Sequence, residues 1–211
     1  MNIAHTHPRH DAGAAVVTTD TMNGLYAIRD PGCAAAIWQR APAPGFQDWI
    51  DGLDPDALPS ARLVLRPEAV PDALTRLGDT HGLPTGPERD WLEADIAELA
   101  NRFATVMRAP YLRLRLDVVT TNACAKFHMD AIFARLVCSY RGTGTQYGLS
   151  QDGGDPDPVE TLPACAPIVM RGSLWPAKTS TTFLHRSPPI AGTGETRLVL
   201  VLDPIFDVED A

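Results

Sequence analysis

The chain has 211 residues and a formal net charge of −8, and 45% of its residues are hydrophobic. This length suffices for one domain with a sizeable core, while the acidic balance argues against a nucleic-acid partner, which usually requires a basic face. No apolar run approaches the roughly 18 to 20 residues needed to cross a bilayer. The opening residues MNIAHTHPRHDAG lack the apolar stretch of a secretory leader, so we expect a cytoplasmic protein without a membrane partner.

The first half of the chain favours helices interrupted by prolines. Residues 1–20, which include three histidines, predict a flexible tail, and residues 21–109 predict a helical extension that packs on the core. The strongest helical pattern is at 87–107, where apolar residues recur at spacings of three and four. Shorter helices are predicted at 33–40, 45–53 and 68–77.

The pattern changes at residue 110, after which β-strands are predicted. Residues 111–119 alternate between apolar and polar or charged side chains with a period of two, which is typical of a half-buried strand. Helices followed by antiparallel strands predict an α+β chain whose core, residues 110–211, is a β-sandwich or barrel. Further strands are predicted at 131–140, 168–175, 181–185 and 196–202.

A pattern of metal ligands begins at His128 and Asp130. Residues i and i+2 of a strand point to one face, so these two side chains could reach one ion. His185 follows 55 residues after Asp130, at the end of a predicted strand. Two histidines and one carboxylate on one face of an octahedral ion leave three positions open, which suits Fe(II), a bidentate co-substrate and O₂. The sequence therefore predicts a mononuclear metal site.

Arg197 opens the strand that follows His185. An adjacent antiparallel strand would bring its guanidinium near the metal site, where it could hold the distal carboxylate of a keto acid through paired hydrogen bonds. An ion pair with Glu195 or Asp203 is the alternative interpretation of the same residue.

The order of these residues (HxD, a strand turned by Gly172, His and then Arg) resembles that of the 2-oxoglutarate and Fe(II)-dependent oxygenase superfamily. The resemblance covers residues 110–204 and implies a double-stranded β-helix, or jelly roll, buttressed by N-terminal helices. It implies that His128, Asp130 and His185 bind Fe(II) and that Arg197 binds 2-oxoglutarate. The enzyme would then hydroxylate a small-molecule, amino-acid or peptide substrate. The chain departs from the family at Val199, where many members have Ser or Thr.

A longer match resembles a bacterial family of unknown function. It comprises Cys-x-x-Phe-His-x-Asp at 124–130, RLVCSYRGTGTQ at 135–146 and HRSPPIAGTGETRLVLVLDP at 185–204. Members of that family often lie near genes of zinc homeostasis, so this resemblance implies a link with zinc. A Cys124 thiolate beside two histidines and a carboxylate would complete a four-ligand zinc site. A zinc-handling protein is therefore one alternative, and a cupin-like metal enzyme without a keto acid is another.

Four further residues are candidates for the surroundings of the metal. Tyr140 shares strand parity with His128, so it is a candidate for a hydrogen bond to the co-substrate, although a packed strand tyrosine fits the pattern equally well. Arg135, Arg171 and Trp175 are candidates for substrate contacts.

Overall fold

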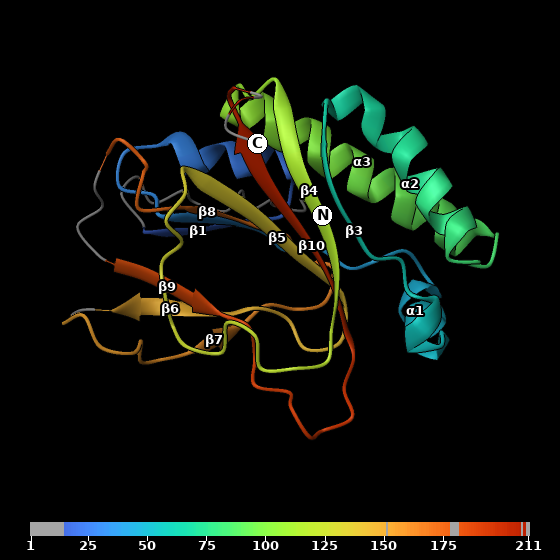
Figure 1. The fold of residues 1–211 in the computed structure, drawn as a ribbon. Helices are drawn as coiled ribbons and strands as arrows, with labels where there is room; N and C mark the ends of the chain where they lie inside the picture. The colour runs from blue at the N-terminus through green and yellow to red at the C-terminus, as the bar shows by residue number, and fades with distance from the viewer. Residues whose placement is uncertain (1–14, 151, 178–181, 208, 210–211) are drawn as a thin grey trace, which may run out of the picture.

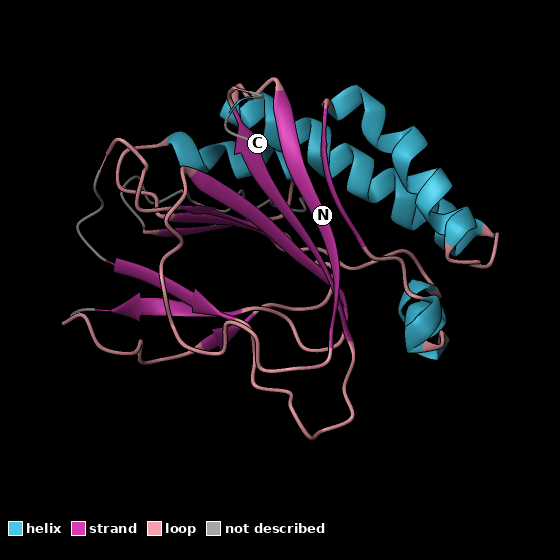
Figure 2. Ribbon diagram, viewed as in Figure 1, coloured by secondary structure: helices cyan, strands magenta, loops and turns pink. Residues whose placement is uncertain are grey.

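The computed structural model describes residues 15–150, 152–177, 182–207 and 209. They form three layers: a group of helices, a seven-stranded sheet and a three-stranded sheet (Figures 1 and 2). The helices cover one face of the large sheet, and the small sheet faces the other.

The large sheet has the strand order β1-β2-β8-β5-β10-β4-β3. All neighbouring strands are antiparallel except β1 and β2, which run parallel. Its strands are β1 (Val16–Thr19), β2 (Ala35–Trp38), β3 (Ala61–Leu65), β4 (Tyr111–Val119), β5 (Ala134–Arg141), β8 (Ile168–Arg171) and β10 (Arg197–Ile205).

The small sheet has the order β7-β6-β9, and both of its pairings are antiparallel. Its strands are β6 (Gln146–Ser150), β7 (Glu160–Thr161) and β9 (Thr182–Arg186).

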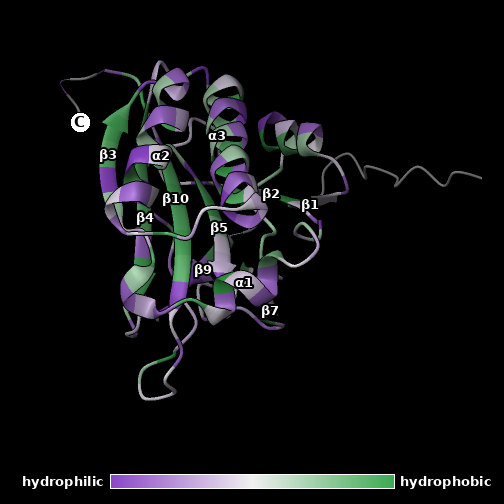
Figure 3. Ribbon diagram, turned by 90° about the vertical axis from the view of Figure 1, so that its right-hand side faces the viewer, coloured by the Kyte–Doolittle hydropathy of each residue, from purple (hydrophilic) through white to green (hydrophobic). Residues whose placement is uncertain are grey.

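Helices α2 (Val70–Thr80) and α3 (Pro87–Met107) lie over the large sheet, and α1 (Phe46–Gly52) lies near its lower edge in Figure 1. Figure 3 shows α2 and α3 in front of the hydrophobic strands β10 and β5. Short 3-10 helices occupy Met22–Arg29, Pro55–Ala57 and Pro67–Ala69. No helix of the described residues is both long and apolar enough to cross a membrane.

Strand β10 separates two hydrophobic cores, because its successive side chains point to opposite faces of the sheet. Leu198, Leu200 and Leu202 pack in the core beneath the helices. Val199 and Val201 pack in the core between the two sheets. Every residue of β10 is buried, so the side chains of this central strand contribute to both cores.

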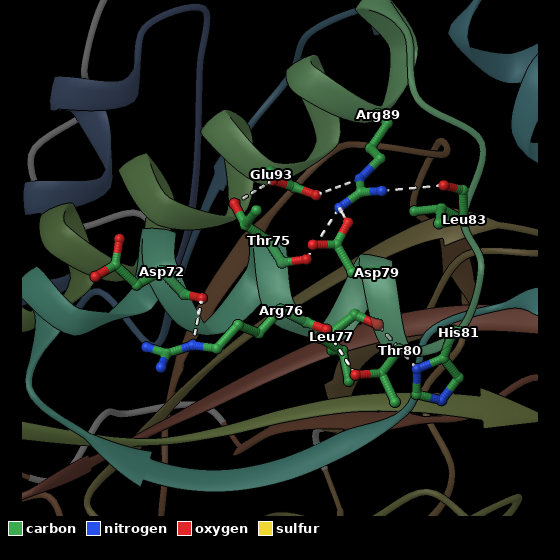
Figure 4. Close-up of polar contacts among 10 residues, drawn as sticks. All are labelled: Asp72, Thr75, Arg76, Leu77, Asp79, Thr80, His81, Leu83, Arg89 and Glu93. Atoms are coloured by element: carbon green, nitrogen blue, oxygen red, sulfur yellow. Dashed lines mark hydrogen bonds and ion pairs between the residues drawn. The ribbon is translucent and has the colours of Figure 1, made fainter.

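Arg89 joins α2 to α3 (Figure 4). Its Nε donates to Glu93 at 2.6 Å, and its Nη2 donates to Asp79 at 2.8 Å and to the carbonyl of Thr75 at 2.9 Å. Its Nη1 donates to the carbonyl of Leu83 at 3.0 Å. The single side chain therefore holds the helical hairpin and the loop that closes it.

A buried polar cluster joins α3 to the large sheet. Both carboxylate oxygens of Asp95 accept hydrogen bonds from the guanidinium of Arg40, and the Tyr140 hydroxyl donates to Asp95 at 2.5 Å. Only 10% of the Arg40 side chain and 5% of the Asp95 side chain are exposed. Burial raises the pKa of Tyr140 well above its usual range, which keeps the hydroxyl as a donor. The cluster joins α3 to β5 on the helix side of the large sheet.

Several predictions of secondary structure are confirmed, including the α+β class, the strand at 111–119 and the helix at 87–107. The predicted helix at 33–40 is wrong, because residues 35–38 form β2. Its alanines have high helix propensity, but they are fully buried between β1 and β8, and pairing in the sheet outweighs that propensity.

The N-terminal segments contribute more to the sheet than the sequence indicated. Strand β1 lies within the predicted tail 1–20, of which only residues 15–20 are described, and His5, His7 and His10 lie outside the described residues. Strands β2 and β3, within the predicted helical extension 21–109, pair with strands of the C-terminal core.

We predict that Asp95→Ala lowers the free energy of unfolding by about 3–5 kcal/mol, because it leaves the buried Arg40 cation without a counter-charge. Tyr140→Phe should cost about 1.5–3 kcal/mol, the range for one hydrogen bond to a charged group. Denaturant unfolding of the purified variants measures both values. The control is Glu98→Ala on the exposed face of α3, which should stay within about 0.5 kcal/mol. An Asp95 variant as stable as that control would show that the cluster does not hold α3 in place.

Candidate metal centre

Two backbone hydrogen bonds bring His128 and His185 together. The N–H of each residue donates to the carbonyl of the other, at 3.0 Å in both cases. This bridge is isolated, because the segment around His128 belongs to no strand, whereas His185 lies in β9 of the small sheet. The two imidazole rings stand with their centroids 4.6 Å apart.

Asp130 is placed by a close contact with the end of β8. The Ser173 N–H donates to the Asp130 carbonyl at 2.9 Å, and the Gly172 N–H donates to the Phe133 carbonyl at 2.9 Å. A Cβ on Gly172 would overlap the carbonyl oxygen of Ile132. The two chains can therefore approach this closely only because residue 172 has no side chain.

The side chains of His128, Asp130 and His185 converge. One ligand atom from each lies within 4.8 Å of the others. Nε2 of His128 is 3.6 Å from Oδ1 of Asp130, and Nε2 of His185 is 3.2 Å from Oδ2. Ligands that occupy adjacent octahedral positions at about 2.1 Å from an ion stand about 3 Å apart, so a small contraction would close these atoms around a metal.

The hydrogen bond of His128 to the backbone sets its tautomer. Nδ1 lies 2.8 Å from the carbonyl oxygen of Lys126, which can only accept. Nδ1 must therefore carry the proton, which leaves a lone pair on Nε2, the atom that faces Asp130. A backbone carbonyl behind the ring is a common support for a metal-binding histidine.

Asp130 remains charged and incompletely satisfied. Burial would raise the pKa of its carboxyl group, but His185 and Arg135 outweigh it and lower the pKa to about 2. Arg135 Nη1 lies 2.8 Å from Oδ1. Oδ2 is buried without a hydrogen-bond donor, because His185 Nε2 is near enough but is not oriented to donate to it. A carboxylate with one oxygen near each of two imidazoles fits a cation.

His128 and His185 line a cavity of about 190 Å³ between the two sheets. Its floor is the inner face of the large sheet, where Val137 of β5 and Val199 and Val201 of β10 lie side by side. Polar or charged side chains around this floor are Arg115, Asp117, Arg135, Thr145, Arg186 and Ser187.

Arg197 is not among the residues that line this cavity, but its guanidinium contacts Ser187, which is one of them. Its side chain is almost fully buried, with 1% of the residue exposed. It donates to the Thr143 carbonyl at 2.6 Å and to the hydroxyls of Ser187 and Ser139 at 3.2 and 3.0 Å. Among the described residues, no carboxylate lies within 4.0 Å of the guanidinium. Burial lowers the pKa of Arg197 to about 10, although Glu195 opposes this shift.

The alternative ion pairs of Arg197 are therefore not formed. Glu195 instead accepts hydrogen bonds from the backbone N–H and hydroxyl of Thr143, at 2.5 and 3.1 Å. Asp203 accepts from Arg135 at 2.7 and 2.9 Å. The two acids nearest to Arg197 in sequence are bound to other groups.

Three of the residues expected around the metal lie elsewhere. Tyr140 is on the helix side of β5, because the irregular segment between Asp130 and β5 breaks the strand parity with His128. Arg171 donates to the carbonyls of Ile28 and Asp30 and stacks on Trp175 at 4.6 Å. Neither Arg171 nor Trp175 lines the cavity, so these three interpretations are corrected.

Cys124 lines the cavity but stands apart from the three ligands. It is exposed, has a left-handed backbone with φ of 57°, and is not part of the metal-ligand cluster. The described residues thus bring together three candidate ligands rather than four.

The sequence interpretation missed several residues of the site. Ser139 and Ser187 accept hydrogen bonds from Arg197. Asp203 accepts hydrogen bonds from Arg135, and Arg115 of β4 lines the cavity. The alternation of Arg113, Arg115 and Asp117 with buried leucines was a usable signal, because charged residues inside a strand between two layers require a polar cavity.

Comparisons with known proteins agree with this architecture. The sequence pattern of the family described as Protein of unknown function (DUF1826) matches residues 19–203. No curated protein sequence matches the chain. A rice dioxygenase for auxin oxidation, solved as a crystal structure, is 15% identical with a TM-score of 0.50, over 92% of this chain and 84% of that one. At this identity the likeness shows the fold alone.

Two other solved structures overlap with most of the chain. An oxidoreductase of the 2OG-Fe(II) oxygenase family from Burkholderia pseudomallei is 16% identical with a TM-score of 0.42, over 90% of this chain and 94% of that one. The dioxygenase for auxin oxidation 1 from Arabidopsis thaliana, in a complex with 2-oxoglutarate, is 10% identical with a TM-score of 0.48, over 92% and 93%.

We predict that Gly172→Ala weakens metal binding by about tenfold to a hundredfold, because the added methyl displaces the backbone that carries Asp130. Titration of the purified protein with Fe(II) without oxygen, or with Co(II), measures the affinity. Gly52→Ala is the matched control, since a Cβ there meets nothing within 4 Å. Equal affinities for the two variants would contradict the role assigned to Gly172.

Proposed function

This chain belongs to the DUF1826 family, and we propose that it is a non-haem Fe(II) oxygenase that uses 2-oxoglutarate as co-substrate. His128, Asp130 and His185 would hold the metal, and Arg197 would bind the distal carboxylate of 2-oxoglutarate. The reaction would hydroxylate a C–H bond of a small organic substrate.

The observation that carries the proposal is the unpaired cation of Arg197. A buried charge is costly unless a counter-charge or a full set of hydrogen bonds compensates it. Arg197 contacts only two hydroxyls and one carbonyl, and burial lowers its pKa. A carboxylate that reached the guanidinium past Ser187, which lines the cavity, would supply the missing charge. Ser139 and Ser187 already orient the guanidinium, and they take the place of the hydroxyl that the family pattern puts two residues after the arginine, where this chain has Val199.

The triad suits the metal that this reaction needs. Two imidazoles and one carboxylate on the same side leave open positions for a bidentate co-substrate and for O₂. When bound, Fe(II) would supply the activation of O₂, driven by oxidative decarboxylation of 2-oxoglutarate. The protein would hold the three ligands, orient the keto acid through Arg197, and restrict water with the valine floor.

The two facing sheets also support a finer description of the fold. We assign them to a double-stranded β-helix that is open at one side, with β9 of the small sheet and the loop at His128 carrying the ligands. The fold similarity to the rice dioxygenase supports this assignment.

The zinc interpretation depends on a fourth protein ligand. Cys124 stands outside the cluster, so a closed four-ligand site would require the loop that carries it to move. A cupin-like metal enzyme without a keto acid would use the same triad, but it offers no counter-charge for Arg197.

We expect the protein, loaded with Fe(II) without oxygen, to bind 2-oxoglutarate and to develop a weak visible charge-transfer band. Arg197→Gln should weaken 2-oxoglutarate binding by about a hundredfold, because it removes a charge-assisted bidentate contact. Arg197→Lys retains the charge and should recover part of the affinity. Upon admission of O₂, the wild-type protein should release succinate. Tightly retained zinc, with no band and no succinate, would refute the oxygenase proposal.

The role of Cys124 is tested by a pair of alanine variants. His185→Ala should abolish metal binding because it removes one of three ligands, whereas Cys124→Ala should leave the affinity within about threefold, since its thiol is not a ligand. Metal content after gel filtration and direct titration measure both. A loss in Cys124→Ala as large as that in His185→Ala would support the four-ligand zinc site instead.

A further inference from the structure

Three cationic side chains line the metal cavity, and Arg115 is the one of them without a hydrogen-bond acceptor among the described residues. Arg115 projects from β4, where it pairs in register with Val201 of β10. Arg197 pairs with Val119, four residues further along β4. Four residues of a strand span about 13 Å, so the two arginines belong to different ends of the valine floor.

Arg115 has few partners for its charge. None of the described residues accepts a hydrogen bond from it, and its Nε is buried without an acceptor. Its terminal nitrogens approach Asp117 at 3.7 Å and Asp203 at 4.0 Å, both beyond hydrogen-bonding distance. A buried N–H without an acceptor costs about 1–3 kcal/mol, so an acceptor supplied by a ligand would be favourable.

The two acids near Arg115 form only long ion pairs with it, and neither accepts a hydrogen bond from it. Asp203 is engaged by Arg135 through two hydrogen bonds, at 2.7 and 2.9 Å. Arg135 forms ion pairs with both Asp203 and Asp130, so its charge is already compensated without a ligand. The side chain of Asp117 is 39% exposed, and a partly exposed pair at 3.7 Å contributes little.

The shape of the cavity restricts what Arg115 could bind. Its volume, about 190 Å³, is below the range of about 300–1,000 Å³ found for ordinary ligand sites, so the ligand must be small. The apolar side chains of Val137, Val199 and Val201 line the same cavity, and Val201 lies directly opposite Arg115 in the sheet. The surface is therefore complementary to a short apolar chain or ring with one anionic end.

We propose that Arg115 binds a carboxylate of the substrate, so that the substrate is a small organic acid whose apolar part lies over the valine floor next to the metal triad. Calling this ligand the substrate rests on the proposed oxygenase function, but its binding by Arg115 does not. The acid would occupy a position separate from that of the co-substrate at Arg197.

The test is calorimetric titration of the full-length protein with short monocarboxylates, from propionate to hexanoate and phenylacetate, each against its primary amide. At least one acid should bind, and its amide should bind about tenfold to a hundredfold more weakly, because the amide lacks the charge that strengthens hydrogen bonds to a guanidinium. Arg115→Gln should weaken binding of the acid by a similar factor and remove the preference over the amide.

Two control variants separate this inference from the proposed function. Arg113→Gln removes the same charge two residues away on the same face of β4, outside the cavity lining, and should bind the acid as the wild type does. Arg197→Gln should also keep acid binding while it loses 2-oxoglutarate. If the acid is lost in Arg197→Gln but kept in Arg115→Gln, the inference fails and the oxygenase proposal stands. Failure of every acid to bind, or equal affinity for acids and amides, would also overturn it.

Discussion

The candidate site depends on the pair of backbone hydrogen bonds between His128 and His185. One partner belongs to an irregular segment that leads into the large sheet, and the other belongs to a strand of the small sheet. Their pairing joins the two layers and sets the two imidazoles side by side. Asp130 is then directed at both rings, because the contact between its segment and Gly172 leaves the loop little freedom. The ligand geometry is thus a consequence of main-chain packing.

The two faces of the large sheet have different roles. The helix side stabilises the fold, and the opposite side forms the candidate site. On the helix side, the Asp95 cluster is internally compensated, since every charge there has a partner. On the other side, Arg197 has no carboxylate partner among the described residues, Arg115 has only long ion pairs, and Asp130 keeps one buried oxygen without a donor. Buried groups that remain unsatisfied in a folded protein mark the places where ligands are expected. Arg115 lines the cavity, and Asp130 lies beside two of its lining histidines.

The sequence predicts which residues are the candidate ligands better than it predicts the backbone structure that brings them together. His128 and Asp130 were paired by strand parity, yet they lie in a loop that makes one isolated bridge. The same parity argument therefore failed for Tyr140, ten residues beyond Asp130, once the irregular segment had shifted the alternation. The alanine-rich segment of β2 favours a helix by local propensity alone, because propensity does not include burial between two other strands. Arg197 could be singled out from its spacing, but the absence of an acid beside it is a property of the folded chain.

The measurement that tests the central claim most directly is a crystal structure of the protein grown without oxygen with Fe(II) and 2-oxoglutarate. The account predicts one ion bound by His128, Asp130 and His185, with the keto acid chelating that ion and its distal carboxylate on Arg197. An ion that recruits Cys124 as a fourth ligand, or a keto acid that does not reach Arg197, would contradict it.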